Sequence, residues 1–262
     1  MKEDLDEVVE TVFRRAPVLA RLVDGAADKP TLVADLDVSR STVDRAVREL
    51  SVHGLVERRG GRVGVTLAGR LAHEAFETYR SRTGDVLVAR SLLSHLEPDS
   101  EVDERVLEGA TVLKMNPAGP GEPTDQTAEF TEDVGRLRAL VQGITNSDGV
   151  EAVRDAVVEE GMVYEPVYGP GIAEFVRDHQ LEPVREMAAT GRFRAFETGP
   201  MPFGLYLADG DDDVSVSIVV HDDDNYYRGS ILVRHRDAFE WAAGVYERYR
   251  RDADEITDRF RP

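Results

Sequence analysis

The chain contains the run Ser39-Arg40-Ser41-Thr42-Val43-Asp44-Arg45-Ala46-Val47-Arg48-Glu49-Leu50, and a few residues later Gly54-Leu55-Val56-Glu57-Arg58-Arg59-Gly60-Gly61-Arg62-Val63-Gly64-Val65-Thr66. In the first run apolar residues recur at i, i+3, i+4 and i+7, the spacing of one buried helix face. Ser39 stands at its start, where a hydroxyl can cap exposed backbone N–H groups. In the second run two β-compatible segments flank Gly60-Gly61, a pair that favours a hairpin turn. With a shorter helical pattern over 31–36 before them, these segments predict a winged helix-turn-helix.

The polar residues of this region fall into two groups. Residues near the amino-terminal end of such a helix reach base edges in the major groove of DNA, and Arg suits a bidentate contact with guanine. We therefore predict base reading by Arg40, Ser41, Thr42 and Arg45. Arginines on the helix and at a hairpin tip can instead contact phosphates, which positions a protein without reading sequence. This second role is expected for Ser39, Arg48, Arg58, Arg59 and Arg62; the alternative is that the arginines are ordinary solvated surface.

The charge of this region differs from that of the whole chain. The 262 residues include 32 Lys and Arg against 51 Asp and Glu, which gives a net charge of −19. Between Ser39 and Arg62 there are six arginines and three acids, a local balance of +3 that leaves −22 for the rest. A basic island in an acidic protein is expected of a surface that binds nucleic acid. Its small size suggests modest affinity without a second subunit, so we expect a homodimer on a double-stranded DNA operator with two half-sites.

The composition resembles that of proteins from extremely halophilic archaea, whose cytoplasm holds molar salt. Nearly all positive charge is Arg, aspartate is abundant, and acidic runs such as Asp209–Asp213 and Asp222–Asp224 separate apolar segments. At about 1 M ionic strength the Debye length is roughly 3 Å, so dense surface charge costs less. These runs are expected to be hydrated surface and not a metal site.

Several other classes of protein are disfavoured. No segment has the roughly 20 apolar residues of a membrane helix, and the amino-terminal residues do not form a secretory signal, so a cytoplasmic protein is expected. The chain has no cysteine and only six scattered histidines, among which His221 and His235 could converge across strands. No nucleophile elbow, dinucleotide fingerprint or phosphate-binding loop is present. We expect no enzyme, no cofactor and no metal.

The chain has room for two domains, and the predicted fold class is α+β. Residues 1–82 are expected to form the winged helix-turn-helix, with a first helix, a second beginning at Pro17, and a helix over 67–79 after the wing. Residues 83–262 are expected to form a mixed α/β sheet domain. In it we predict helices over 84–96, 134–141, 150–159, 172–179, 183–190 and 237–255, strands over 162–167, 193–197, 204–208, 214–220 and 230–233, and an irregular loop over 116–123.

Three segments of the second domain carry a more specific resemblance. They are Glu160–Glu165, Met201-Pro202-Phe203-Gly204-Leu205-Tyr206-Leu207-Ala208-Asp209, and Ala238–Arg250 with its Glu240-Trp241 pair. In this order they resemble the carboxyl-terminal domain of the archaeal regulators typified by the methanogen filamentation and methanogenesis regulator. In that family the domain follows a winged helix, and the resemblance implies transcriptional regulation. It assigns no ligand-binding residues.

Two roles remain open for the second domain. As a sensor, it would hold a small-molecule effector at one end of the sheet near Tyr164, Tyr168, Arg194, Phe203 and Tyr206, and binding would shift the DNA-reading helices. As a ligand-free dimerisation or protein-docking module, it would need no such pocket. The aromatic residues of the last helix, Phe239, Trp241, Tyr246 and Tyr249, are more often core packing than a binding surface.

Overall fold

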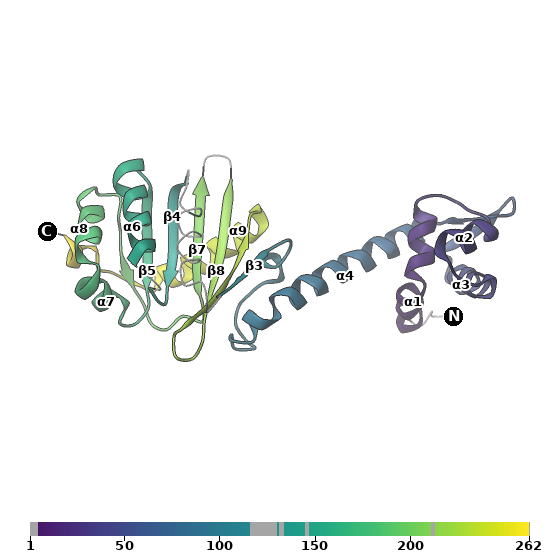
Figure 1. The fold of residues 1–262 in the computed structure, drawn as a ribbon, viewed down its shortest axis with the longest axis horizontal. Coiled ribbons are helices and arrows are strands. Elements are labelled where there is room, and N and C mark those ends of the chain that lie inside the picture. Colours follow the sequence, from purple (N-terminus) through teal and green to yellow (C-terminus); the bar gives the residue numbers. More distant parts are fainter. Residues whose placement is uncertain (1–4, 116–129, 131–133, 145–146, 211–212, 262) are drawn as a thin grey trace. The chain divides into compact units, whose positions relative to one another are not determined.

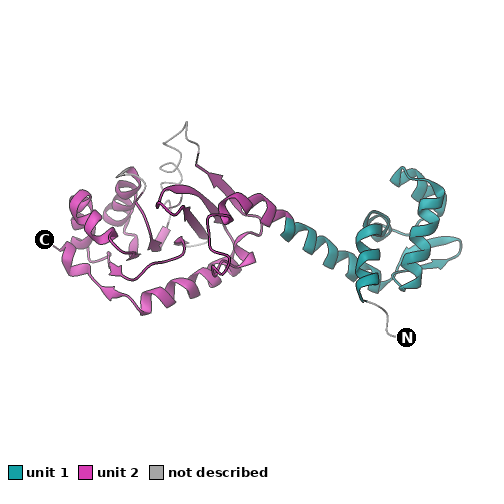
Figure 2. Ribbon diagram, turned by 90° about the horizontal axis from the view of Figure 1, so that it is seen from below, with its two compact units in different colours: residues 1–83 teal, residues 84–262 magenta. Residues whose placement is uncertain are grey.

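A computed structural model describes residues 5–115, 130, 134–144, 147–210 and 213–261. The predicted loop over 116–123 and part of the acidic run 209–213 lie outside the described residues. The chain divides into two compact units, residues 1–83 and residues 84–262 (Figure 2). Together the units contain helices and a large mixed sheet, so the predicted α+β fold class is confirmed.

Unit 1 is a winged helix-turn-helix. It contains three helices, a two-stranded antiparallel ribbon and the first part of a long helix (Figure 1). One apolar core, built from α1, α2, α3 and the ribbon, holds these elements together. The elements are α1 (Leu5–Val23), α2 (Lys29–Leu36), α3 (Arg40–Val52), β1 (Val56–Arg59), β2 (Arg62–Val65) and α4 (Leu67–Leu93).

The expectation of a separate helix beginning at Pro17 is wrong, because α1 runs through Pro17 without a break. The helix buries Val12, Ala16, Leu19 and Leu22 on one continuous stripe across the proline. A proline inside a helix removes one hydrogen bond and costs about 3 kcal/mol. Burial of several apolar side chains on both sides of Pro17 outweighs that cost.

The helices expected over 67–79 and 84–96 are likewise one helix, α4. The Thr83-Gly84 pair did not end it, since an isolated glycine inside a helix costs only about 1 kcal/mol relative to alanine. The boundary between the two compact units therefore falls inside α4. None of the helices in the described ranges is long and apolar enough to cross a membrane.

Unit 2 is built on an eight-stranded mixed sheet with the strand order β10-β6-β5-β4-β7-β8-β9-β3. The β4 and β5 strands pair in parallel, whereas β4, β7, β8 and β9 form an antiparallel series. The strands are β3 (Thr111–Lys114), β4 (Val134–Val141), β5 (Val163–Tyr168), β6 (Phe196–Glu197), β7 (Gly204–Gly210), β8 (Val214–His221), β9 (Tyr227–Val233) and β10 (Asp254–Glu255).

Helices cover both faces of this sheet. The α9 helix (Arg236–Arg251) packs on one face, over β4, β7 and β8 (Figure 1). The other face carries α6 (Ser147–Asp155), α7 (Ile172–His179) and α8 (Leu181–Ala189). Short helical turns lie at Glu104–Val106, Ala156–Glu160 and Thr257–Phe260. Each face of the sheet thus has its own apolar core.

One segment expected to be a helix, residues 134–141, is the strand β4. It pairs with β5 on one side and β7 on the other. Leu137 and Ala139 are buried in the core on the α6 side, while Leu140 is buried in the core beneath α9. A central strand buried on both faces has a nearly continuous apolar sequence, and hydrophobic periodicity alone cannot distinguish such a sequence from that of a buried helix. The edge strand β3 was not predicted, and the other edge strand, β10, lies within the segment 237–255 that was expected to be helical.

The last helix confirms the core interpretation of its aromatic residues. Phe239 and Tyr246 are buried, and Trp241 and Tyr249 pack against the same core. The hydroxyl of Tyr246 donates a hydrogen bond of 3.0 Å to the backbone oxygen of Glu165. These side chains therefore fix α9 to the sheet.

Candidate functional site

The helix α3 begins where the sequence places its cap. The Ser39 hydroxyl accepts a hydrogen bond of 3.1 Å from the backbone N–H of Thr42, and it also lies 2.8 Å from the hydroxyls of Ser41 and Thr42. The four apolar residues of the predicted stripe, Val43, Ala46, Val47 and Leu50, are fully buried. The stripe fixes which way the opposite face of α3 points.

That opposite face is exposed and basic. Ser41, Arg45 and Arg48 follow one another at i, i+4 and i+7 and are all exposed. Arg40 is also exposed, whereas Thr42 is half-buried beside the cap. Among the residues that the structure describes, no carboxylate forms an ion pair with Arg40, Arg45 or Arg48. Most of the predicted base-reading group thus stands at the surface of one short helix.

The two acids of α3, by contrast, are paired with basic residues from neighbouring helices. Lys29 of α2 donates a hydrogen bond to Asp44, and Arg15 of α1 donates one of 2.8 Å to Glu49. The hydrogen bond from Lys29 lowers the pKa of Asp44, and that from Arg15 lowers the pKa of Glu49. Both carboxylates therefore form their ion pairs with cations from α1 and α2, and the described residues contain no ion pair of an α3 arginine.

The wing is a tight hairpin. Its central residues Gly60 and Gly61 have φ angles of 57° and 81°, the left-handed pair that a two-residue hairpin turn requires. Arg59 faces Arg62 across this turn, and both are exposed. Arg59 pairs with Glu57 at 3.0 Å, and Arg62 donates to the backbone oxygen of Ala26. Arg58, also exposed, has no such partner within the described ranges.

Asp222 of the acidic run 222–224 and His235 have structural roles. The carboxylate of Asp222 accepts hydrogen bonds from the backbone of Asp224 and Tyr226 and pairs with Arg228. His235 caps α9 and does not lie with His221: its Nδ1 accepts from the Ala238 N–H at 3.3 Å, and its Nε2 donates to the Arg105 backbone oxygen. The described residues contain no group of three or more side chains that could hold a metal ion.

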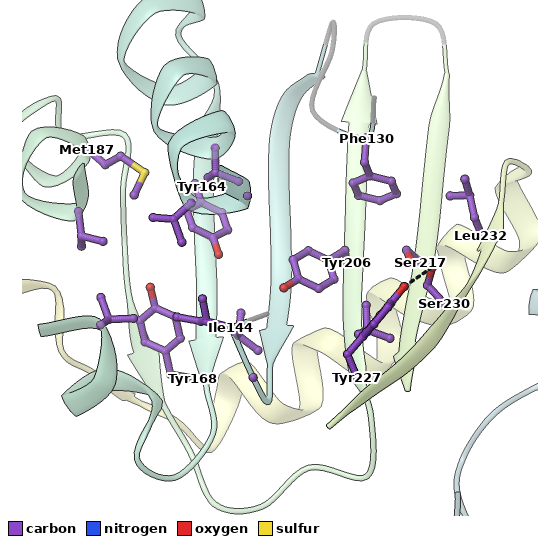
Figure 3. Close-up of a pocket in the computed structure, with 18 of the residues that line it drawn as sticks. Phe130, Ile144, Tyr164, Tyr168, Met187, Tyr206, Ser217, Tyr227, Ser230 and Leu232 are labelled. Atoms are coloured by element: carbon purple, nitrogen blue, oxygen red, sulfur yellow. Dashed lines mark hydrogen bonds between the residues drawn. The ribbon is translucent and has the colours of Figure 1, made fainter. Parts of the chain in front are cut away.

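Unit 2 contains a cavity of about 150 Å³ between the sheet and the helices α6, α7 and α8 (Figure 3). Tyr164 and Tyr168 of β5 and Tyr206 of β7 line it, and Figure 3 shows these three side chains in the cavity. Other aromatic and hydroxyl-bearing residues in the lining are Phe130, Ser217, Tyr227 and Ser230; the remainder are Leu113, Val141, Gly143, Ile144, Gly149, Val150, Val153, Val176, Val184, Met187, Val219 and Leu232.

The phenols of the cavity are held in their neutral form. Burial raises the pKa of Tyr206 to about 12, and it raises the pKa values of Tyr164 and Tyr168 above the ordinary value of 10.0 as well. The pKa values of Tyr164 and Tyr168 are also raised by Tyr206, which shows that the three phenols are electrostatic neighbours. Neutral phenols both donate and accept hydrogen bonds.

Two residues of the predicted pocket lie elsewhere. Phe203 is buried in the core on the α9 face of the sheet, where its ring stacks on Trp241. Arg194 pairs with Glu255 at 2.8 Å and lies over the ring of Phe196. Successive side chains of a strand point to opposite faces, so Phe203, three residues from Tyr206, belongs to the other face.

The sequence interpretation missed the hydroxyls contributed by β8 and β9. Ser217 and Ser230 line the cavity together with Tyr227, whose hydroxyl lies 3.5 Å from that of Ser230. In β8 the alternation of Ser215, Ser217 and Val219 with the buried Val216, Ile218 and Val220 was the available signal. It shows a strand with one face in a core and the other facing more polar surroundings.

A winged helix-turn-helix with unpaired arginines, followed in one chain by an α/β unit, defines the class of the protein as a transcription regulator. Two family models match the chain. The model described as HVO_A0261 N-terminal domain matches residues 3–85, and the model described as Methanogenesis regulatory protein FilR1, middle domain, matches residues 120–252. The second covers just over half of the chain, so the chain belongs to this family of archaeal regulators, and the resemblance seen in the sequence is confirmed.

Other comparisons are more distant. No curated protein matches the chain. The solved structure of TrmBL2, an archaeal chromatin protein, is similar with a TM-score of 0.44 and 14% identity over 97% of this chain and 100% of that one. NucT from Helicobacter pylori is similar with a TM-score of 0.42 and 9% identity over 56% of this chain and 98% of that one. At TM-scores below 0.5 neither likeness bears on function.

Proposed function

We propose that the protein is a sequence-specific regulator that binds double-stranded DNA as a homodimer and responds to a small molecule held in unit 2. The single observation that carries the DNA-binding part is the pairing pattern of α3. Its acids are neutralised by Lys29 and Arg15, while Arg45 and Arg48 are exposed without a carboxylate partner among the described residues. A helix arranged in this way presents a positive face although the whole chain carries a charge of −19.

Position on the helix divides the proposed roles. Arg40, Ser41, Thr42 and Arg45 stand in the amino-terminal half of α3, the half that reaches base edges in this motif. Arg48 and the wing arginines Arg58, Arg59 and Arg62 stand beyond it and contact phosphates, with Ser39 at the helix start. The proposed role involves no catalysis, no cofactor and no metal.

The test begins with selection of preferred sequences from random DNA by the full-length protein, followed by affinity measurements on the selected duplex. Replacing Arg45→Ala is expected to cost about 1–3 kcal/mol and to relax the preference at one base pair. Arg177→Ala, which removes an exposed arginine of α7 in unit 2, is the matched control and leaves affinity unchanged. An equal loss on specific and random DNA would assign Arg45 to phosphate, and the absence of any selected motif would refute sequence-specific binding.

An exposed apolar patch of unit 1 supports the homodimer. Leu5, Val9 and Phe13 are exposed along α1, and the Phe13 ring contacts those of Phe76 and exposed Tyr79 of α4 at centroid distances of 4.8 and 5.4 Å. A second copy covering this patch would supply the second recognition helix that a two-half-site operator needs. Light scattering checks it: the wild-type chain is expected to be a dimer and Phe13→Glu a monomer. A monomeric wild-type chain at micromolar concentration would refute the homodimer.

The effector part is supported by the cavity and competes with the docking-module alternative. Binding of a ligand and binding of DNA would be linked reciprocally. A ligand that changes the affinity for DNA must therefore bind to the DNA-bound protein with a different affinity from that for the free protein. Mass spectrometry of the natively purified chain distinguishes the two. A mass above that of the polypeptide, lost on denaturation, is expected for a sensor, whereas a bare polypeptide with a copurifying protein supports docking.

A further inference from the structure

The cavity of unit 2 is walled by uncharged side chains on every side that the described residues form. Beneath the helices the wall is aliphatic, with Val153, Val184 and Met187. Over β8 and β9 it carries the hydroxyls of Ser217 and Tyr227. Its chemistry is therefore apolar with a few polar groups, the usual composition of a small-molecule site.

Three of the polar groups in its wall are phenols. Among the described residues, none hydrogen-bonds to the phenol oxygens of Tyr164, Tyr168 or Tyr206. Only 8% of Tyr164 and 3% of Tyr168 is exposed, and both side chains line the cavity. A molecule bound in the cavity can accept hydrogen bonds from these hydroxyls and donate hydrogen bonds to them.

The same surroundings disfavour an anion. The burial that raises the pKa values of the three phenols penalises any negative charge in that space, including one brought by a ligand. The amino-terminal end of α6, which lies at the cavity wall through Gly149, could favour an anion through its dipole. However, Asp148 already places a carboxylate in the first turn of that helix.

The size of the cavity limits the ligand further. A cavity of about 150 Å³ has room for a single benzene-sized ring. Its walls include the rings of Tyr164, Tyr168 and Tyr206, and aromatic rings pack well against a further ring.

We propose that the cavity binds an uncharged, single-ring aromatic molecule that carries a hydroxyl or amide group, held by the phenols of Tyr164, Tyr168 and Tyr206. Only the effect of this ligand on DNA binding rests on the proposed sensing function, since the binding of the ligand is argued from the cavity itself. Aliphatic side chains of α6, α7 and α8 cover one side of the ring, and the free phenol groups bond to its polar substituent.

The test uses three probes that differ in one group: phenol, its anionic counterpart benzoate, and its nonpolar counterpart toluene. Each is titrated into the full-length protein at neutral pH to millimolar concentration and followed by ligand-observed NMR. Phenol is expected to bind saturably, at least about tenfold more tightly than benzoate and several-fold more tightly than toluene. Benzoate binding as tightly as phenol, or no saturable binding of phenol, overturns the assignment.

Two variants locate the site. Tyr168→Phe and Tyr206→Phe each delete one hydroxyl and keep the ring, so phenol affinity is expected to fall about two- to tenfold while toluene affinity stays the same. Tyr226→Phe is the matched control, because Tyr226 is 67% exposed in unit 2 and does not line the cavity. Unchanged phenol affinity in both cavity variants contradicts the role given to the phenols.

A parallel measurement separates this assignment from the proposed function. The affinity of the same preparations for selected DNA is measured with and without saturating phenol. A change in affinity, absent in Tyr206→Phe at the same phenol concentration, supports both binding and sensing. Saturable phenol binding with unchanged DNA affinity leaves the ligand class in place and refutes sensing through this ligand class.

Discussion

The proposed DNA-binding face of α3 in unit 1 and the proposed ligand cavity of unit 2 differ in how their electrostatic character arises. On α3 the acids are paired and the arginines are left free, so a positive surface forms on a strongly acidic chain. In the cavity, charged side chains are absent from the described wall, and burial holds the phenols neutral. The net charge of the chain therefore says little about either site, because a binding partner interacts with the charge that is left unpaired at the site itself.

The two sites also depend differently on their surroundings. The face of α3 owes its charge to Lys29 and Arg15, which come from other helices and pair with its two acids. The cavity is neutral because charged side chains are absent from its described wall, to which six strands and three helices supply apolar or hydroxyl side chains. A single substitution can therefore change the charge of α3, whereas the cavity is altered mainly through its shape and hydroxyls.

The largest expected effect comes from the core that fixes α3. Leu50→Ala truncates a fully buried side chain and is expected to destabilise unit 1 by about 2–5 kcal/mol. Hydrogen exchange read by mass spectrometry follows both units at once, and protection should fall in residues 5–83 alone. The matched variant Leu205→Ala, also fully buried, should affect unit 2 instead. Equal loss of protection throughout the chain after either substitution would show that the units do not unfold independently.

Much of unit 1 could be predicted because its signals are local. A serine cap, a four-residue apolar stripe and a pair of glycines each specify backbone conformation within a few residues. The helix over Ile172–His179 was predicted with the bounds that the structure gives it. By contrast, the identity of β4 is set by pairing with β5 and β7, whose partner residues lie far along the chain. No local pattern specifies such pairing.

The same distinction explains the candidate cavity. Tyr164, Tyr168 and Tyr206 were chosen as aromatic residues near strand ends, and the structure brings them together. Phe203 was chosen for the same reason but faces α9, and Arg194 is held by Glu255 of a strand near the end of the chain. Alternation along β7 could have excluded Phe203. The pairing of Arg194 could not be inferred, since it needs the position of β10.

A sharper test of the α3 face removes one of the cations that neutralise its acids. Arg15→Ala leaves Glu49 charged and unpaired near the proposed DNA surface, so affinity for all duplexes is expected to fall by about two- to fivefold. The pKa of Glu49, which Arg15 lowers, should return toward its ordinary value. The double variant Arg15→Ala with Glu49→Gln should restore affinity without restoring the ion pair. If affinity stays low in the double variant, Arg15 acts through the packing of α1 and not through charge.

The histidine beside the cavity gives the stability of unit 2 a dependence on pH. His221 is buried, both of its ring nitrogens lack a partner among the described residues, and burial lowers its pKa from 6.5. Below pH 6.5 the unfolded chain binds the proton more readily than the folded one, so the stability of unit 2 should fall as the pH drops from 6.5 toward the lower folded pKa. Denaturant titrations at several pH values should show this fall in the wild-type chain and a flatter profile in His221→Gln.

His95→Gln removes an exposed histidine of unit 2 and serves as the control, with the wild-type profile expected. Asp222, next to His221, does not confuse the measurement. Hydrogen bonds from the Tyr226 backbone and from Arg228 lower its pKa below 3.8, so it stays ionised throughout this pH range. A profile of His221→Gln that still falls below pH 6.5 would assign the dependence to another group.

The smallest expected effect concerns the wing, where the charge of a single side chain, Arg59, is tested. The Arg59 side chain is 83% exposed at the hairpin tip and pairs with Glu57 at 3.0 Å. If Arg59 neutralises one phosphate, Arg59→Ala should lower affinity for specific and random duplexes alike, and the slope of log affinity against log salt should decrease by about 0.9. Loss of an ordinary surface arginine such as Arg177 should leave the slope unchanged. The contribution of Arg59 to DNA affinity arises from released counterions, so it should shrink toward zero in molar salt. Any difference in affinity between Arg59→Ala and the wild-type chain that remains in molar salt would have to come from a contact other than one with a phosphate charge.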